Sequence, residues 1–170
     1  MQKEKNIEED SFTIGDEIIY PTHGLGVITD QEKDKISGIE VEMFVIRFEH
    51  EKMTLRVPID KAHGHGMRHI SDKKEMKKAL LILKSPSNVK RTMWSRRAQE
   101  YESKLHSGDP ILIAEVLRDL NRSTEDPEQS YSERQLYEEA FDRLVRELAA
   151  VEEIDSDAAS KRVENILKPS

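Results

Sequence analysis

The sequence has no cysteine in its 170 residues, which excludes disulfide bonds and thiolate metal ligands. It also lacks any apolar run near the ~18 residues that a membrane-spanning helix needs. Its polar start, MQKEKNIEED, has no apolar core of the kind found in a secretory signal. We therefore expect a cytoplasmic protein without a membrane partner.

Three of the six histidines lie in a single segment, at His63, His65 and His69. A zinc site needs about four ligands in tetrahedral geometry, and no obvious carboxylate completes a set here. No pairing of a nucleophile with a base stands out either. We predict no metal, no cofactor and no catalytic residue, so the chain should not be an enzyme. A metal-dependent enzyme that uses these three histidines is kept as an alternative.

Charge is unevenly distributed in this chain, whose net charge is -7. Residues 1–70 carry a net charge of -5, residues 71–122 a net charge of +5, and residues 123–170 a net charge of -7. A local basic block can bind phosphates whatever the sign of the whole chain. The alternative is that its lysines are ordinary solvated helix faces.

The first part of the chain has the pattern of short strands separated by turns. A strand over 12–20 is followed by a turn with Gly24 and Gly26, and the run VEMFVIRF over 41–48 is rich in β-branched and aromatic residues. The polar stretch between them, DQEKDKISG, reads as a connection. Four or five strands in about 60 residues are typical of a small Tudor-like or SH3-like barrel.

Residues 53–57 alternate between apolar and polar side chains. The alternation predicts that Met53, Leu55 and Val57 face the core. Thr54 and Arg56 should then lie on the opposite face of the strand.

The second part of the chain has helical periodicity. About five helices packed as a bundle are expected. The predicted fold class is α+β, with a disordered tail over 1–11, a Tudor/SH3-like β-barrel over 12–70 and an all-α domain over 71–170. The predicted starts of the helices are Ser71 or Asp72, then Asn88 or Thr92, then Asp109 with Pro110, then Ser130 with Glu133 in a capping box, with a short last helix before Pro169.

The segment KRTMWSRR, residues 90–97, combines four cationic residues with the only tryptophan of the chain. Cationic side chains favour phosphates, and an aromatic ring offers a flat apolar surface to a base step. Trp94 also lies at helical spacing with Ala98, Tyr101 and Leu105, which is the pattern of a core residue. Both interpretations of Trp94 stay open on periodicity alone.

The chain contains, in order, the strings GDEIIYPTHGLG, MTLRVP, WSRR, SGDPILIAEVLRDL and SERQLYEEAFDRLVRELA. Over roughly residues 12–150 it resembles the CarD/CdnL group of bacterial transcription regulators. The resemblance implies a Tudor-like domain, shared with a transcription-repair coupling factor, that docks on the β subunit of RNA polymerase. It also implies that the helical domain lies against promoter DNA at the upstream edge of the transcription bubble and stabilises the open complex.

The resemblance assigns roles to individual residues. It implies that the ring of Trp94 inserts as a wedge in the minor groove beside the fork, with Arg96 and Arg97 as the basic pair that follows it. We expect sequence-tolerant DNA contact, because phosphate contacts and a minor-groove wedge do not read base edges. The predicted DNA-binding residues are Trp94, Arg96, Arg97, Lys90 and Arg91.

On the strand domain, a polymerase-contacting arginine of the family matches Arg56. A second basic position of the family falls near Asp34 and Lys35. Because Asp34 departs from the pattern, only Lys35 is carried over. The predicted polymerase-binding residues are Arg56, Thr54, Leu55 and Lys35.

The sequence therefore predicts a monomeric regulator without catalytic activity, whose partners are the RNA polymerase β subunit and promoter DNA. The alternative is a protein–protein adaptor with no direct DNA contact, in which the basic block is only solvated. That alternative predicts a buried Trp94.

Overall fold

The computed structural model describes residues 11–87, 92–121 and 130–168. The chain divides into two compact units, residues 1–70 and 71–170, and each is treated on its own below. Nearly all of the tail predicted over 1–11 lies outside the described residues.

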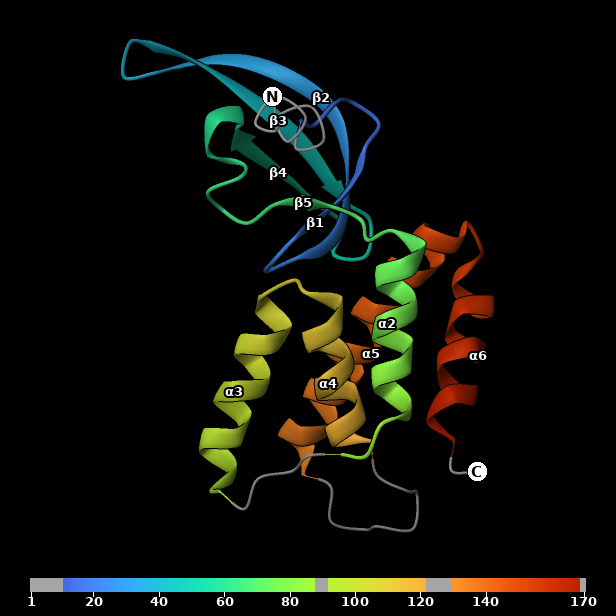
Figure 1. The fold of residues 1–170 in the computed structure, drawn as a ribbon. Coiled ribbons are helices and arrows are strands. Elements are labelled where there is room, and N and C mark those ends of the chain that lie inside the picture. Colours follow the sequence, from blue (N-terminus) through green and yellow to red (C-terminus); the bar gives the residue numbers. More distant parts are fainter. Residues whose placement is uncertain (1–10, 88–91, 122–129, 169–170) are drawn as a thin grey trace, which may run out of the picture. The chain divides into compact units, whose positions relative to one another are not determined.

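The first unit is built on a five-stranded antiparallel sheet (Figure 1). A single-turn 3-10 helix, η1 (Ile59–Lys61), follows its fourth strand. The strands are β1 (Glu17–Tyr20), β2 (Gly24–Ile36), β3 (Ile39–Phe48), β4 (Met53–Pro58) and β5 (Arg68–His69).

The sheet is open, with the strand order β4-β3-β2-β1-β5. The predicted Tudor/SH3-like β-barrel was therefore wrong in that the sheet does not close, while the α+β class is confirmed. The physical reason lies in the lengths of the edge strands. At one edge β5 has only two residues, too short a strand to extend a ladder of hydrogen bonds to β4 at the other edge.

The longest hairpin of the sheet joins β2 to β3 through Ser37 and Gly38. Both residues have positive φ, 53° and 79°, as a two-residue type I′ turn requires. The polar stretch DQEKDKISG, predicted as a connection, is mostly strand, with Ile36 paired to Ile39 across the turn. The prediction failed because this part of the hairpin is largely exposed, so it shows no apolar alternation.

The core of the first unit lies on one side of β2, β3 and β4. Val57 is buried there, and Met53 and Leu55 are partly buried against the same cluster, which confirms the alternation predicted for 53–57. Gly26 is needed by this packing, because a Cβ atom at its position would lie 2.7 Å from the ring of Phe48.

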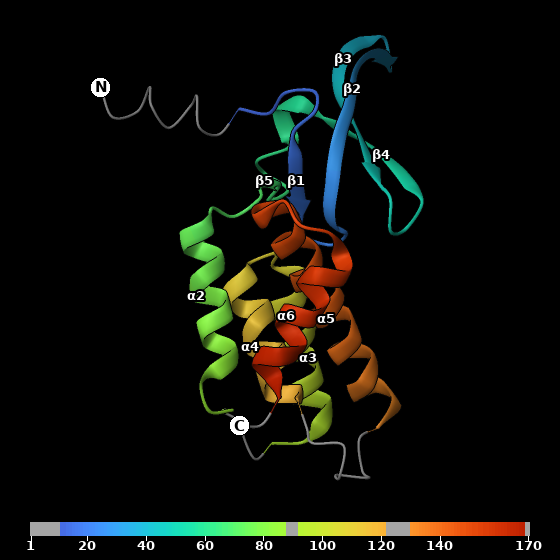
Figure 2. The same ribbon diagram turned by 90° about the vertical axis from the view of Figure 1, so that its right-hand side faces the viewer.

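The second unit contains five α-helices in the part of the chain that the structure describes (Figures 1 and 2). Helix α4 has a central place, because it contacts α2, α3 and α5, while α6 packs on α5 and α2. None of the described helices is both long and apolar enough to cross a membrane. The helices are α2 (Lys73–Lys84), α3 (Trp94–His106), α4 (Pro110–Leu120), α5 (Tyr131–Glu152) and α6 (Ser156–Leu167).

Four of these helices begin at a side chain that caps them. Asp72 accepts a hydrogen bond from the amide of Glu75, and Ser130 accepts one from the amide of Glu133. Asp109 and Asp155 cap α4 and α6 in the same way. Helix α3 is the exception, because its N-cap residue is Met93, which makes no side-chain cap. The predicted start at Thr92 thus falls one residue before the observed N-cap, and the alternative start at Asn88 lies outside the described residues.

A buried carboxylate joins the start of α2 to the end of α5. Glu147 Oε2 accepts hydrogen bonds from the backbone amide of Ser71, at 2.9 Å, and from the Ser71 hydroxyl. Both residues are buried, so each polar group satisfies the other away from water.

Candidate functional site

Trp94 is the first residue of α3 and lies half-buried at the surface of the helical unit. Its indole Nε1–H donates a hydrogen bond to Ser132 Oγ at 3.0 Å, across to the first turn of α5. The ring is thus neither a fully enclosed core residue nor a free side chain. Its position is held by a contact between residues that are 38 apart in the sequence.

Arg97 packs its guanidinium against two aromatic rings of α3. The guanidinium carbon lies 5.4 Å from the centroid of the Trp94 ring and 5.8 Å from that of Tyr101. Its Nη2 also donates to the Tyr101 hydroxyl at 3.5 Å. Tyr101 is only 5% exposed, so Arg97 links the half-buried Trp94 to the core of the unit.

The structure describes two of the four cations that are predicted to bind DNA. Arg96 is exposed at the surface of α3, whereas Arg97 is half-buried between the rings. Lys90 and Arg91 lie outside the described residues. Of the basic pair after Trp94, Arg96 is therefore the side chain available to a phosphate.

Two exposed apolar side chains flank the contact between Trp94 and Ser132. Met93 precedes Trp94 and is 76% exposed, and Tyr131 precedes Ser132 and is 77% exposed. Because Trp94 and Ser132 are hydrogen-bonded, Met93 and Tyr131 belong to the two helix starts that meet at the indole ring. We call these two helix starts, with Met93, Trp94, Arg96 and Tyr131, the surface around Trp94.

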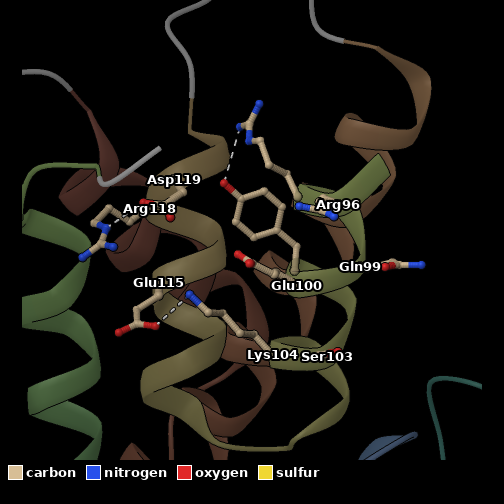
Figure 3. A pocket seen from close by; sticks show the side chains of 10 residues that line it. Arg96, Gln99, Glu100, Ser103, Lys104, Glu115, Arg118 and Asp119 are labelled. Atoms are coloured by element: carbon tan, nitrogen blue, oxygen red, sulfur yellow. Dashed lines mark hydrogen bonds and ion pairs between the residues drawn. The ribbon is translucent and has the colours of Figure 1, made fainter. Parts of the chain in front are cut away.

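A groove of about 860 Å³ lies between α3 and α4 (Figure 3). Two ion pairs lie within the groove: Lys104 Nζ is 3.2 Å from Glu115 Oε2, and Arg118 Nε is 3.0 Å from Asp119 Oδ1. Mutually neutralised pairs offer little to a polyanion. Arg96 and Arg97 line the same groove, so we place the candidate nucleic-acid contact at these residues of α3 and not at the paired charges.

On the sheet unit, Arg56 projects from β4 on the face opposite the core. Its Nε donates to Glu32 Oε2 on β2 at 2.9 Å. The hydrogen bond and the charge of Glu32 raise the pKa of Arg56 above its usual value, so the guanidinium is charged at any physiological pH. Arg56 remains exposed, and its charge can be shared with a partner.

The two neighbours of Arg56 that were also predicted to bind polymerase point in opposite directions. Thr54 is exposed beside it and accepts a hydrogen bond from Arg47 Nη1 at 3.3 Å. Leu55 is partly buried against the core cluster. The strand that carries all three, β4, ends the sheet, so one side of its backbone has no neighbouring strand within the described sheet.

Lys35, the fourth predicted polymerase-binding residue, lies near the tip of the hairpin between β2 and β3. It is exposed, pairs with Glu40 across the hairpin, and is not part of β4. The exposed Ile36 and Ile39 lie beside it at the turn. The structure thus brings Arg56 and Thr54 together on β4 and places Lys35 on a different part of the same sheet.

The three clustered histidines pack around aromatic rings. The His63 ring stacks on Phe12 with a centroid distance of 4.9 Å, and the His69 ring lies tilted against Phe12 at 4.7 Å. His65 Nδ1 is 3.3 Å from the Tyr20 hydroxyl. No group of three or more histidine, aspartate or glutamate side chains is placed to hold a metal ion within the described ranges.

Two family models together match nearly the whole described chain. The model described as the CarD, C-terminal domain matches residues 78–164, and the one described as the CarD-like/TRCF RID domain matches residues 12–71. The chain belongs to the CarD family. This confirms the resemblance that the motifs of the sequence carried.

The chain is also similar to individual proteins. The chain is 29% identical over 143 residues to the candidate transcription factor YdeB of Bacillus subtilis (strain 168), covering 84% of this chain and 94% of that protein. A solved structure, the NMR structure of the 72-residue N-terminal domain of Myxococcus xanthus CarD, is 22% identical. It covers 35% of this chain and 80% of that chain, with a TM-score of 0.31.

Sequence reasoning missed one residue of this CarD-family site, Ser132. Its hydroxyl accepts the indole N–H of Trp94 and lies 3.3 Å from the hydroxyl of Ser130, the cap of α5. The only signal in the sequence was its place in the capping segment SYSE. Nothing in that local pattern points to a tryptophan on another helix.

Proposed function

We propose that the chain is a non-catalytic transcription regulator that binds the β subunit of RNA polymerase and promoter DNA at once. Residues 12–70 form the polymerase-interacting domain, and residues 71–170 form the DNA-contacting domain. The helical domain acts at the upstream edge of the transcription bubble and stabilises the open complex. Membership of the CarD family supports this proposal.

The observation that carries the DNA half of the proposal is the half-buried Trp94, at a place where two helix starts meet that carry the exposed Met93, Tyr131 and Arg96. An apolar side chain inserted at a base step needs a ring that is partly exposed and firmly supported, because unstacking a step costs a few kcal/mol. Arg97 and Ser132 supply that support. Arg96 then contacts phosphate without reading sequence.

The polymerase half rests on β4. Arg56 offers an exposed, permanently charged guanidinium, and the strand beneath it ends the described sheet. An end strand can pair its backbone with an extended segment of a partner, while side chains such as Thr54 and Arg56 provide specificity. Leu55, partly buried against the core cluster, stays part of the predicted interface and also supports the strand.

Tethering explains how an acidic chain can act on DNA. With a net charge of -7, the chain should bind free DNA weakly. Docking one domain on the polymerase raises the effective concentration of the other at the promoter to about the millimolar range. One monomer per polymerase is sufficient for this mechanism.

A protein–protein adaptor without direct DNA contact is the second candidate, and one observation favours it. The indole N–H of Trp94 is already bound to Ser132, as in a residue whose role is to join two helices. In that case the surface around Trp94 serves only the packing of α3 on α5.

The test is to co-purify the full chain with RNA polymerase and then measure the lifetime of open complexes on a promoter after adding a competitor. We expect co-purification and a lifetime that increases with the concentration of the chain. Co-purification without any change in lifetime would favour the adaptor. Failure to bind the polymerase would overturn the proposal as a whole.

A further inference from the structure

A second groove, of about 1000 Å³, runs between α2 and α6 in the helical unit. Its floor is apolar: Leu80 and Leu83 of α2 are buried, and Ile166 and Leu167 of α6 are partly buried. Leu81 stands at its edge and is 55% exposed, which is unusual for a leucine next to a helix contact. The helix pair therefore leaves apolar surface uncovered along its outer side.

The edge of this groove carries charge of one sign. The ten described residues that line it include no aspartate or glutamate, although the chain as a whole has a net charge of -7. The cationic residues on the lining are Lys77, Lys84, Arg162 and Lys168. Arg162 makes one long ion pair, with Nη1 3.9 Å from Oε1 of Glu152, which does not line the groove. No acidic residue among the described lining neutralises the four cations.

The spacing of the lining matches a helical ligand. Lys77, Leu80, Leu81 and Lys84 stand at i, i+3, i+4 and i+7 on α2, which places them along one face over about 10 Å, or two helical turns. A helix laid along the groove would meet apolar contacts in the middle and cations at both sides.

We propose that the groove between α2 and α6 docks an acidic amphipathic helix of a protein partner. Apolar side chains of that helix cover Leu80, Leu81 and Ile166, and its carboxylates face Lys77 and Lys84. Duplex DNA could pair its phosphates with the cations of the groove, but a phosphate backbone has no apolar groups to cover the leucines. The groove shares no lining residue with the surface around Trp94, so the inference does not depend on the proposed function.

The probe is a fluorescein-labelled 18-residue peptide with leucines at i, i+3, i+4 and i+7 and glutamates at most other positions. A peptide of the same composition with the leucines scrambled is the first control, and one with every glutamate replaced by lysine is the second. Binding to the full-length protein is followed by fluorescence anisotropy, with a labelled 20-base-pair duplex measured in parallel.

Two substitutions test the groove in the protein. Leu81→Glu replaces the exposed leucine by a carboxylate, which repels the glutamates of the peptide. Lys84→Glu reverses the charge of one cation that lines the groove. Lys74→Glu is the matched control, because Lys74 is exposed on the same helix and does not line the groove. Circular dichroism melting shows that each variant is folded.

We expect the acidic amphipathic peptide to bind, both control peptides to bind at least tenfold more weakly, and Leu81→Glu and Lys84→Glu to weaken binding about tenfold. Lys74→Glu should change the affinity less than threefold.

Three results would overturn the inference. The first is no binding of the amphipathic peptide at about 1 mM, and the second is equal binding of the scrambled peptide. The third is preference for the duplex, which would make the groove a nucleic-acid surface. Sedimentation adds a further outcome: a dimer of the wild type that Leu81→Glu abolishes would show that a second copy of the chain covers the groove, which also contradicts the proposal.

Discussion

Arg56 on the sheet and Trp94 on the helical unit are the two candidate contact residues, and they differ in how they are held. Arg56 is exposed on a regular strand, and one ion pair with Glu32, on the same sheet, accompanies it. Trp94 is half-buried at an uncapped helix start and is held by Ser132 and Arg97. Arg56 is thus exposed because side chains alternate between the two faces of a strand. Trp94, by contrast, is positioned by contacts with Ser132 of α5 and Arg97 of α3.

The difference predicts different responses to substitution. Removing Arg56 should affect mainly binding, since its side chain is exposed and is held by one ion pair with Glu32. Removing Trp94 should affect both the contact surface and, to a smaller degree, the stability of the helical unit. The predictions below test this contrast from the largest expected effect to the smallest.

The largest effect is expected from Arg56→Glu. Charge reversal places two carboxylates side by side at Glu32 and removes the cation offered to the polymerase, so the affinity for the β subunit should fall about thirtyfold. The melting temperature should move by less than about 2 °C, because the Arg56 side chain is exposed at the surface. Surface plasmon resonance with immobilised polymerase measures the affinity.

Two controls sharpen the test of Arg56. Lys61→Glu makes the same change in net charge at an exposed residue of η1 and should leave the affinity unchanged. Glu32→Gln keeps Arg56 and removes its partner, so binding should be retained. Equal loss of affinity in Lys61→Glu would show that net charge, and not Arg56, is responsible.

Trp94→Ala should shorten the lifetime of open complexes about tenfold, which corresponds to ~1.4 kcal/mol. Because the ring is only half-buried, the free energy of unfolding should fall by about 1–2 kcal/mol. Leu105→Ala on the same helix is the comparison: Leu105 is 0% exposed, and its truncation should cost about 2–5 kcal/mol. A destabilisation by Trp94→Ala as large as that by Leu105→Ala, with a normal lifetime, would favour the adaptor.

The pair Arg96 and Arg97 should separate in their effect on salt dependence. Arg96→Ala should weaken DNA binding about threefold and reduce the slope of log K against log salt by about one unit, because an exposed phosphate contact is lost. Arg97→Ala should leave the slope nearly unchanged, since that guanidinium packs on two rings. Equal slopes for Arg96→Ala and the wild type would remove Arg96 from the interface.

The smallest effect is expected from Ser132→Ala. Losing the acceptor of the indole N–H should cost about 0.5–1 kcal/mol of stability and shift the emission of the only tryptophan to longer wavelength by a few nanometres. Ser132→Thr retains a hydroxyl and should keep the wild-type spectrum. An unchanged spectrum in Ser132→Ala would show that the hydrogen bond does not hold the ring in solution.

Much of the fold could be predicted from the sequence where the cause is local. The caps at Asp109 and Ser130 and the alternation over 53–57 depend on residues within a few positions of one another, and all three are confirmed. The start of α3 could not be predicted, because it begins at Trp94 without a capping side chain.

The candidate site was predicted in part for the same reason. Arg56 was placed on the outer face of its strand by the period of two, which is independent of the rest of the fold. Trp94 could not be assigned to core or surface, since the same stripe with Tyr101 and Leu105 fits both. The hairpin over 24–48 was underestimated because its exposed part carries no alternation.

The sequence by itself determined the class of the molecule, the change from strands to helices near residue 71, and the family, because each follows from short-range patterns or from motifs read in order. Only the tertiary structure decided that the sheet stays open, that Trp94 is half-buried against Ser132, and that cations of α2 and α6 share one apolar groove. The physical reason is common to all three: they depend on contacts between segments far apart in the chain, and no local pattern encodes which of those segments meet.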